Sequence, residues 1–316
     1  MILPAVTGND VPQAAQRSSA GRNGAVARVV TAALRTRRGK VGAALALVVL
    51  AVAFVGPLVP SGSPTSFAAP PFSSPGAGEA GLLGTDVLGR DVVARVLHGG
   101  YKLLLLAFAA TALSVMLGAV IGVVAAYRRG AVEGLLMRGV DVVLAIPQLV
   151  FVLLLLSVIG PKWWLLILAV GLSQAPQTAR VIHAAAQSVA ERDFVKAVAI
   201  WGVPPRTVIR RHVLPNLTTP LMVEAGLRLS YSIILISGLS FLGLGPEPPA
   251  PDWGVMINEN RLGLSTNPWG VLAPAILLAI LAVGTNTFAD AVARANLGEE
   301  RGEQAVMASA LSEASE

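Results

Sequence analysis

The sequence has no cysteine, only three histidines and few charged residues, which make up 13% of its 316 positions. Without cysteine the chain forms no disulfide bond and has no thiolate for chemistry. The histidines, His98, His183 and His212, are far apart and have no second histidine at ligand spacing. This scatter argues against a metal site, a nickel site included.

The sequence also lacks the motifs of nucleotide binding and nucleophilic catalysis. It contains no Gly-x-x-x-x-Gly-Lys-Ser/Thr phosphate loop, so it cannot bind ATP by that route. The triplet Gly238-Leu239-Ser240 precedes Phe241, where a serine protease would need glycine, and no later span supplies a histidine base. We predict no catalytic residue, no metal site and no cofactor bound by this chain.

What the sequence does contain is apolar residues, which account for 54% of the chain. That share, with so little charge, is too apolar for an ordinary soluble domain. A helix that crosses a bilayer needs roughly 20 mainly apolar residues. Six runs qualify, at 41–60, 103–126, 138–160, 163–186, 216–244 and 270–292. The sequence therefore predicts an all-α membrane protein with six transmembrane helices.

Basic residues are distributed unevenly between these runs. Most lie before the first run, after the second and around the fourth: Arg17, Arg22, Arg28, Arg35, Arg37, Arg38, Lys40, Arg128, Arg129, Arg138, Arg180, Arg192, Lys196, Arg206, Arg210 and Arg211. Fewer lie in the alternate loops: Arg90, Arg95, Lys102, Lys162 and Arg261. Because cytoplasmic loops carry the excess of Lys and Arg, both termini and the loop 187–213 are predicted to be cytoplasmic. The net charge of +6 thus indicates topology, and no basic soluble domain points to nucleic acid.

The segments outside the main core are predicted as follows. Residues 1–40 form a cytoplasmic tail, irregular to about 27, with a short basic interfacial helix at 28–40 that anchors the first span, 41–60. Residues 296–316 form a second, irregular cytoplasmic tail. Between these ends lies the permease core, 103–295, with five spans and the loop 187–213.

Residues 61–102 are predicted to form an extracytoplasmic loop with one amphipathic helix. Its first part is rich in Pro, Gly and Ser, and Thr85 or Asp86 is placed to cap the helix that follows. Gly99-Gly100 is expected to end that helix. With one apolar side and one charged side, it is expected to lie on the membrane and not to cross it.

Several charged residues and prolines stand inside the predicted spans, and four of them are candidates for a functional role. Asp141 falls in the third span, where Pro147 removes a backbone donor and predicts a kink. Glu224 and Arg228 are four residues apart in the fifth span, a spacing that allows them to pair. Charges in spans usually face a protein interior or water. These residues either line a translocation path or gate, or have a structural role.

The most informative segment is the charged stretch 191–216 between the fourth and fifth runs. Its apolar residues recur at helical spacing and form one stripe: Phe194, Ala197, Val198 and Trp201. Gly202 is suited to end this helix, and Pro204-Pro205 suits the first turn of another. The alternative is an ordinary connector whose helix lies on the bilayer.

The spacing in this stretch resembles the EAA loop of ABC importer permeases. In that loop a Glu-Ala-Ala start is followed by a glycine and then by Ile-x-Leu-Pro. The matching residues are Lys196-Ala197-Val198, Gly202 and His212-Val213-Leu214-Pro215. The sequence differs from the general pattern at Lys196, Val198 and His212, so an ion pair made by the family's glutamate is not implied.

Further motifs resemble the C-type subunit of the dipeptide, oligopeptide and nickel branch of that family. They stand in the family's order: Leu83-Gly84-Thr85-Asp86 with Leu88-Gly89-Arg90-Asp91, Arg138-Gly139-Val140-Asp141 with Leu144-Ala145-Ile146-Pro147, Arg211 to Asn216, and Leu239 to Gly245 with Pro248-Pro249 and Trp253-Gly254. Together they cover most of residues 83–262. In this branch a histidine at position 212 is familiar.

The resemblance implies a subunit of the type I ABC importer permease kind, with six spans and a cytoplasmic coupling helix between spans four and five. It implies these partners: a homologous permease in a heterodimer, two cytoplasmic ATPases that use ATP and magnesium, an extracytoplasmic substrate-binding protein, and the bilayer of a bacterial cytoplasmic membrane. The coupling residues it implies are Phe194, Lys196, Ala197, Val198, Trp201, Gly202, His212, Leu214 and Pro215.

We therefore expect a non-catalytic, multi-pass permease subunit that forms half of a path for short peptides. Two alternatives stay open. One is a secondary transporter driven by an ion gradient, which predicts titratable groups at mid-membrane and broken helices in symmetric halves. The other is the same family importing nickel or another small solute.

Overall fold

The computed structural model describes residues 22–76, 81–246 and 249–313, and the side chains of residues 22–28, 194, 196, 199 and 296–313 lie outside this description. In the described part, regular structure is helical apart from two isolated bridges, Phe67–Arg90 and Thr85–Asp91. The helices are α1 (Arg22–Arg35), α2 (Arg37–Val55), α3 (Val92–Arg128), α4 (Ala131–Leu144), α5 (Gln148–Ile159), α6 (Trp163–Ala190), α7 (Asp193–Ile200), α8 (Pro205–Val208), α9 (Thr218–Leu239), α10 (Trp253–Asn260) and α11 (Trp269–Glu313). The all-α prediction is confirmed.

Five helical stretches of the described chain are long and apolar enough to cross a membrane: Arg37–Leu58, Val92–Arg128, Trp163–Ala190, Pro205–Leu244 and Trp269–Ala295. The predicted third span is instead the pair α4 and α5, bent by 81°. Pro147 stands directly before α5 and has no N–H to continue the helix from α4. The count is therefore five spans, or six if the bent pair is one span.

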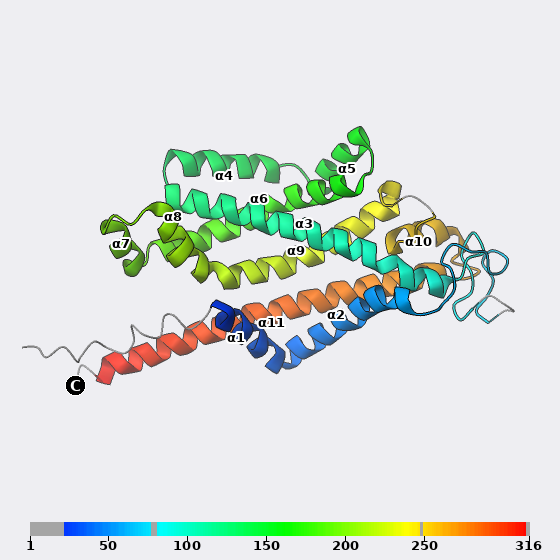
Figure 1. The fold of residues 1–316 in the computed structure, drawn as a ribbon, viewed down its shortest axis with the longest axis horizontal. Coiled ribbons are helices and arrows are strands. Elements are labelled where there is room, and N and C mark those ends of the chain that lie inside the picture. Colours follow the sequence, from blue (N-terminus) through cyan, green and yellow to red (C-terminus); the bar gives the residue numbers. More distant parts are fainter. Residues whose placement is uncertain (1–21, 77–80, 247–248, 314–316) are drawn as a thin grey trace, which may run out of the picture.

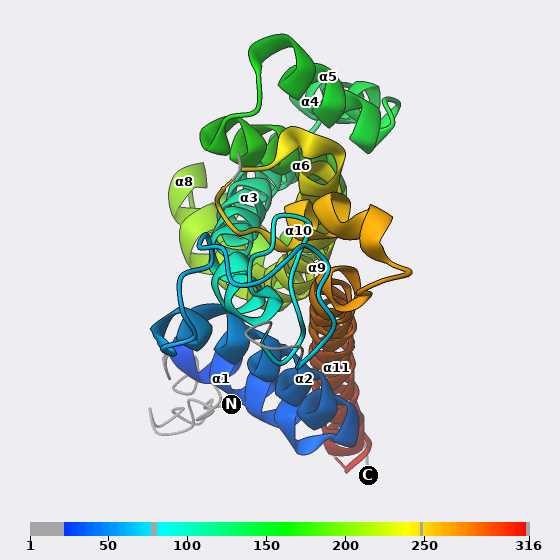
Figure 2. The same cartoon turned by 90° about the vertical axis from the view of Figure 1, so that its right-hand side faces the viewer.

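The helices form layers around a central group. Figures 1 and 2 show α4 and α5 on one side of α3, α6 and α9, and α1, α2 and α11 on the opposite side. Small residues allow α3 and α6 to approach closely. A Cβ on Gly118 would lie 2.6 Å from Thr178 Cβ, and one on Gly122 would lie 2.6 Å from the carbonyl oxygen of Ala179. Gly118-x-x-x-Gly122 thus allows α3 and α6 to pack closely.

The amphipathic helix predicted before the second span is not a separate element. Helix α3 begins at Val92, capped by the Asp91 carboxylate, which accepts from Val93 N at 3.0 Å and Ala94 N at 3.4 Å. It continues through Gly99-Gly100 to Arg128. The prediction of a helix end there is wrong because the two glycines make room for the Trp253 indole, 3.0 Å and 2.4 Å from their hypothetical Cβ atoms.

Both predicted tails contain helix. Helix α1 starts at Arg22, before the expected segment 28–40, and its Val29 and Ala33 pack on Ala291 and Val292 of α11. The chain then turns at Thr36, whose hydroxyl accepts from Gly39 N at 3.0 Å and caps α2. Helix α11 runs to Glu313, so residues 296–313 continue a helix and do not form an irregular tail.

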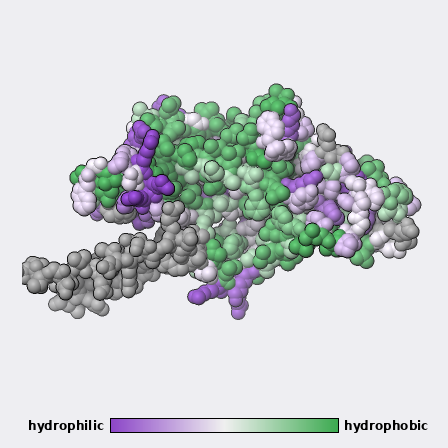
Figure 3. Space-filling view, viewed as in Figure 1, coloured by the Kyte–Doolittle hydropathy of each residue, from purple (hydrophilic) through white to green (hydrophobic). Residues whose placement is uncertain are grey.

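The hydropathy of the surface changes along the long axis of the bundle. In Figure 3, apolar residues cover the middle, and hydrophilic residues gather around α8 and the neighbouring ends of α3 and α4 at one end, over the loops and α10 at the other, and at the α1–α2 junction. The exposed residues at that junction include Arg37, Arg38 and Lys40. An apolar belt between polar ends is the surface that a bilayer requires.

Candidate functional site

The stretch singled out by the sequence forms a separate structure at one end of the bundle. Helices α7 and α8 extend beyond the ends of α3 and α6 (Figure 1). Val195 of α7 and Val208 of α8 are 3% and 0% exposed and share an apolar cluster with Val123 of α3 and Ile182 of α6. Burial of these residues fixes the stretch to the ends of two spans.

The opposite face of α7 is apolar and uncovered. Ile200 and Trp201 are both 82% exposed, and Ala197 is exposed beside them. The residues of the predicted stripe therefore lie on two sides of the helix. Val198 packs inward, next to Val195, whereas Ala197 and Trp201 face outward. The side chains of Phe194 and Lys196 lie outside the described residues. Sequence reasoning missed Val195 and Ile200, although Val195 and Val198 stand at helical spacing.

Gly202 terminates the first half of this stretch. Its φ of +76° lies in the left-handed region, which non-glycine residues rarely adopt. The Trp201 N–H still donates to the Ala197 carbonyl at 3.2 Å, and α8 starts at Pro205 after Pro204. The predicted helix end and the proline-led second helix are both present.

The chain then returns to the bundle through a wide and a tight helical turn. Ile209–Val213 forms a π-helical turn and Leu214–Leu217 a 3₁₀ turn. The Asn216 side chain donates to the His212 carbonyl at 2.7 Å. Pro215 is half-buried and Leu214 is 37% exposed. His212, Leu214 and Pro215 thus belong to the connection into α9 and not to the exposed face of α7.

Glu224 and Arg228, both on α9, form an ion pair at the contact with α6, as their spacing predicted. Glu224 Oε2 lies 3.2 Å from Arg228 Nε and accepts from Thr178 Oγ1 at 3.2 Å. The guanidinium also donates to Gln177 Oε1 and lies 5.2 Å from the Tyr231 ring centroid. Glu224 and Arg228 are 4% and 8% exposed. A buried pair with this many partners is placed to join two helices.

An uncharged polar cluster lies between the same helices and α3. Ser232 Oγ accepts from Thr111 Oγ1 and from Gln174 Nε2, each at 3.0 Å. Among the described residues, Gln174 Oε1 is buried without a hydrogen-bond partner. The sequence analysis missed this cluster because hydroxyl and amide residues spaced far apart in apolar runs give no pattern.

Asp141 lies elsewhere, on the outer layer. It is about half exposed and pairs with Arg180 of α6. Closer to the start of α4, Glu133 Oε1 lies 2.9 Å from His183 Nε2 and accepts from Gln187 Nε2 at 2.8 Å. The structure therefore does not bring Asp141 and Pro147 together with Glu224 and Arg228. Instead Asp141 and Glu133 connect α4 to α6.

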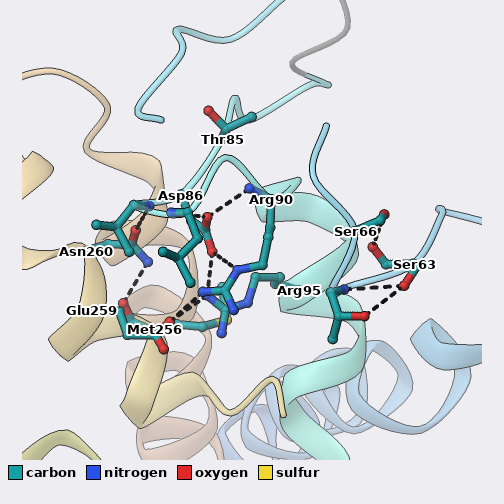
Figure 4. A network of polar contacts seen from close by, with 12 residues as sticks. Ser63, Ser66, Thr85, Asp86, Arg90, Arg95, Met256, Glu259 and Asn260 are labelled. Carbon is teal, nitrogen blue, oxygen red and sulfur yellow. Dashed lines mark hydrogen bonds and ion pairs between the residues drawn. The ribbon is translucent and has the colours of Figure 1, made fainter. Parts of the chain in front are cut away.

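The opposite end of the bundle contains a buried ionic network (Figure 4). Asp86 Oδ2 lies 2.6 Å from both Arg90 Nε and Arg95 Nη1. Glu259 Oε2 of α10 lies 2.9 Å from Arg90 Nη2 and 2.7 Å from Arg95 Nη1. Two carboxylates thus neutralise two guanidinium groups, and the loop before α3 is joined to α10. Asp86 acts here as an ionic partner and not as the predicted helix cap.

The polar loop that leads into α10 is held by Asp252 and Trp253. The Asp252 carboxylate accepts from Gly254 N at 2.9 Å and Val255 N at 3.2 Å and caps the helix. Burial raises the pKa of Asp252, and the two backbone donors and Arg95 oppose that rise. Trp253 is fully buried and donates from Nε1 to the Val96 carbonyl at 2.8 Å. Trp253 is therefore held against the first turns of α3, while the loop motif at 83–91 contacts the far end of α10 through Arg90–Glu259 and Val87–Asn260.

The histidines do not form a metal centre with the acidic residues. Among the described residues, no group of three or more His, Asp and Glu side chains is placed to hold a metal ion. His98 Nδ1 lies 2.8 Å from the Ala94 carbonyl of its own helix, and His183 contacts Glu133.

Comparison with known proteins gives a consistent set of relatives. Residues 114–297 match the family described as binding-protein-dependent transport system inner membrane component. A Brucella suis biovar 1 protein named as a peptide transport system permease is 34% identical over 260 residues, 81% of this chain and 86% of the relative. Another from the same organism, named as a peptide permease, is 39% identical over 204 residues, 63% and 68% of the two chains. A solved structure of the MetNI methionine ABC transporter in inward-facing conformations has a TM-score of 0.48 and 19% identity, over 62% of this chain and 93% of that one.

Proposed function

The chain belongs to the binding-protein-dependent transport system inner membrane component family, and we propose that it is a permease subunit of an ATP-driven importer for short peptides. The peptide substrate is supported by the two Brucella relatives, whose printed names specify peptide transport. The chain contributes half of the translocation pathway and contains no nucleotide site of its own. It acts as a non-catalytic, multi-pass membrane subunit.

The observation that carries this function is the exposed apolar face of α7. Ile200 and Trp201 are 82% exposed at an end of the bundle that is otherwise polar. Two large apolar side chains exposed on a short helix of this kind favour contact with another protein. Because Val195 fixes the other face of α7 to α3 and α6, a push on α7 reaches those spans directly. We propose that the partner on this face is a cytoplasmic ATPase.

The remaining parts of the complex follow from this role. Two ATPases bind ATP and magnesium, a homologous permease supplies the other half of the path, and a binding protein delivers peptide on the opposite side. The chain lies in a bacterial cytoplasmic membrane with both termini, α7 and α8 in the cytoplasm. The excess of basic residues in the corresponding loops supports this orientation.

The path itself is proposed to run along the α4–α5 side of the central helices. Large apolar side chains face outward on this side: Leu135, Val142 and Leu154 are each at least 63% exposed. A second permease would cover them. Asp141 and the bend at Pro147 lie on this side. Glu224 and Arg228 are assigned a structural role because both are buried between α6 and α9.

The test is ATP-driven uptake of labelled peptide by vesicles that contain the reconstituted importer. The double variant Ile200→Ser, Trp201→Ser removes the exposed face and leaves Val195 in place. We expect uptake to fall at least about tenfold and binding of the ATPases to weaken, since truncating an interface hot spot, a role in which tryptophan is enriched, costs about 2 kcal/mol or more. The matched control is Leu262→Ser, a residue 84% exposed at the other end of the bundle.

The result also separates the importer from a secondary transporter. Normal ATP-driven uptake by the double variant would contradict the coupling role of α7. Uptake driven by an ion gradient in vesicles without ATPases would contradict the importer itself. Loss of uptake in the double variant, with normal uptake by the Leu262 control, supports both parts of the proposal.

A further inference from the structure

A strongly basic hollow lies on the chain just before it enters the fifth span. It has a volume of about 690 Å³ and is lined by Arg206, Thr207, Arg210, Arg211 and Pro215. The three arginines are exposed, and two of them, Arg206 and Arg210, are four residues apart. Three guanidinium groups and one hydroxyl around a single hollow offer donors to an anion.

These arginines have no acidic partner within the part of the chain that the structure describes. Arg90 and Arg95 are each paired with two carboxylates and Arg228 with Glu224. Even the exposed Arg129 pairs with Glu191. Arg128, Arg138 and Arg192 are exposed without an ion pair among the described residues, but they do not line a common hollow as Arg206, Arg210 and Arg211 do. The charge around the hollow is therefore available to a ligand.

The arginines are presented outward by the packing behind them. Val208, Val213 and Leu217, from the same short stretch, are 0%, 2% and 0% exposed and pack on the ends of α3 and α6. Their burial holds the stretch against the bundle and leaves the arginine-lined side uncovered. The hollow is thus formed by residues that are held in place by packing.

One edge of the hollow reaches the headgroup layer. From Leu244, at the far end of this span, a helical chain reaches Pro215 after roughly 44 Å, at 1.5 Å per residue. A bilayer with its headgroups is roughly 40–45 Å thick. The Pro215 edge of the hollow is therefore placed at the cytoplasmic headgroup layer, and the three arginines, which precede Pro215 in the chain, follow on its cytoplasmic side. Leu214, 37% exposed, is available for the adjoining acyl region.

We propose that this hollow binds the phosphate of an anionic phospholipid. Arginine forks match phosphate oxygens, and basic pockets on the cytoplasmic side of membrane helices bind anionic headgroups. A lipid fits better than an ATPase surface because the apolar face proposed for the ATPase, Ile200 and Trp201, lies on the other side of the Gly202–Pro204 turn. An occupied hollow would hold the end of α9 and the coupling segment at a fixed depth.

The test measures which lipids the full chain retains. The chain is placed in lipid nanodiscs of phosphatidylcholine with a minor fraction of phosphatidylglycerol, and retained lipids are counted by native mass spectrometry. We expect phosphatidylglycerol to be enriched on the natural chain. The variant Arg206→Gln, Arg210→Gln, Arg211→Gln should abolish the enrichment, and Arg210→Gln alone should reduce it about fivefold, since each basic residue near an anionic surface contributes about 1 kcal/mol.

A matched control has the same loss of charge at other sites. Arg128, Arg138 and Arg192 are exposed near the same end of the bundle and do not line the hollow. Their replacement by glutamine should leave the enrichment close to that of the natural chain. Equal losses in the two triple variants would reduce the effect to general surface charge and overturn the proposal.

Two further arms distinguish other occupants. Release of phosphatidylglycerol by excess inorganic phosphate would identify free phosphate as the ligand and overturn the lipid assignment. Unchanged enrichment in the hollow variant, together with weaker ATPase binding in pure phosphatidylcholine, would assign the arginines to the ATPase. The lipid count uses neither transport nor the ATPases, so failure of the lipid proposal is distinguishable from failure of the proposed function.

Discussion

The pair Glu224 and Arg228 shows what a few side chains do inside a membrane protein. Charged groups in an apolar environment are costly unless they are paired and hydrogen-bonded. Here the carboxylate also accepts from Thr178 and the guanidinium donates to Gln177. Because Thr178 and Gln177 both belong to α6, the pair fixes the position of α9 on α6.

This arrangement predicts different results for single and double variants. Glu224→Gln or Arg228→Met alone leaves one buried charge without its partner and should destabilise the protein by about 3–5 kcal/mol. The double variant removes both charges and should be clearly more stable than either single variant. Thermal unfolding in detergent measures the order, and peptide uptake by the double variant measures function.

A structural role requires that uptake persists in the double variant. If the double variant unfolds like the natural chain but transports nothing, the pair belongs to the path and the structural assignment is wrong. A conservative control is Tyr231→Phe, which keeps the ring 5.2 Å from the Arg228 guanidinium carbon and should leave both readouts close to normal.

At the scale of helices, the close packing of α3 against α6 depends on glycines, which have no Cβ. Gly122→Ala would place a Cβ 2.6 Å from the Ala179 carbonyl oxygen and 2.8 Å from the His183 nitrogen, both backbone atoms that cannot rotate away. We expect a loss of about 1–3 kcal/mol of stability from this overpacking. The unfolding temperature in detergent measures it.

The matched control for that change is Gly134→Ala in α4. No atom lies within 4 Å of a Cβ at Gly134, and its helix is otherwise regular. Alanine there should stabilise the helix by about 0.5–1 kcal/mol, since glycine in a helix interior costs that much. Equal effects of the two substitutions would show that α3 and α6 are not packed as described.

Local sequence signals predicted the helices better than their ends or their neighbours. The apolar runs located the spans, and Gly202 and Pro204-Pro205 marked the turn in the coupling segment, because glycine and proline act through their own backbone. The continuity of α3 through Gly99-Gly100 could not be predicted, since it depends on Trp253, more than 150 positions later. A separation of 50 residues likewise hid the contact of Glu133 with His183.

For the candidate site, too, local signals were informative and contacts between distant residues were not predictable. Spacing predicted one helical stripe of Phe194, Ala197, Val198 and Trp201, but which residues of this helix face outward depends on the ends of α3 and α6. Val195 faces these ends and is buried, and Trp201 faces away and is exposed. A periodicity identifies a helical face and does not show which neighbour covers it.

Over the whole molecule, the two polar ends differ in how their arginines are paired. At one end, Arg90 and Arg95 are neutralised in the network with Asp86 and Glu259 and hold a loop to α10. At the other, the arginines around the hollow stay unpaired among the described residues, and the apolar face of α7 is exposed. At the first end the two buried arginines are neutralised within the chain, whereas at the second end exposed arginines are available to partners.

The absence of cysteine makes the orientation of these ends directly measurable. A single cysteine at Ile200→Cys or Leu262→Cys would be the sole thiol in the chain, and these positions are 82% and 84% exposed at opposite ends of the bundle. We expect a membrane-impermeant maleimide to label Ile200→Cys in inside-out vesicles and Leu262→Cys in right-side-out vesicles, because basic loops remain cytoplasmic. The cysteine-free parent is the control for background labelling. The reverse pattern would place α7 outside the cell, where no ATPase could reach it, and would contradict both the orientation and the coupling role.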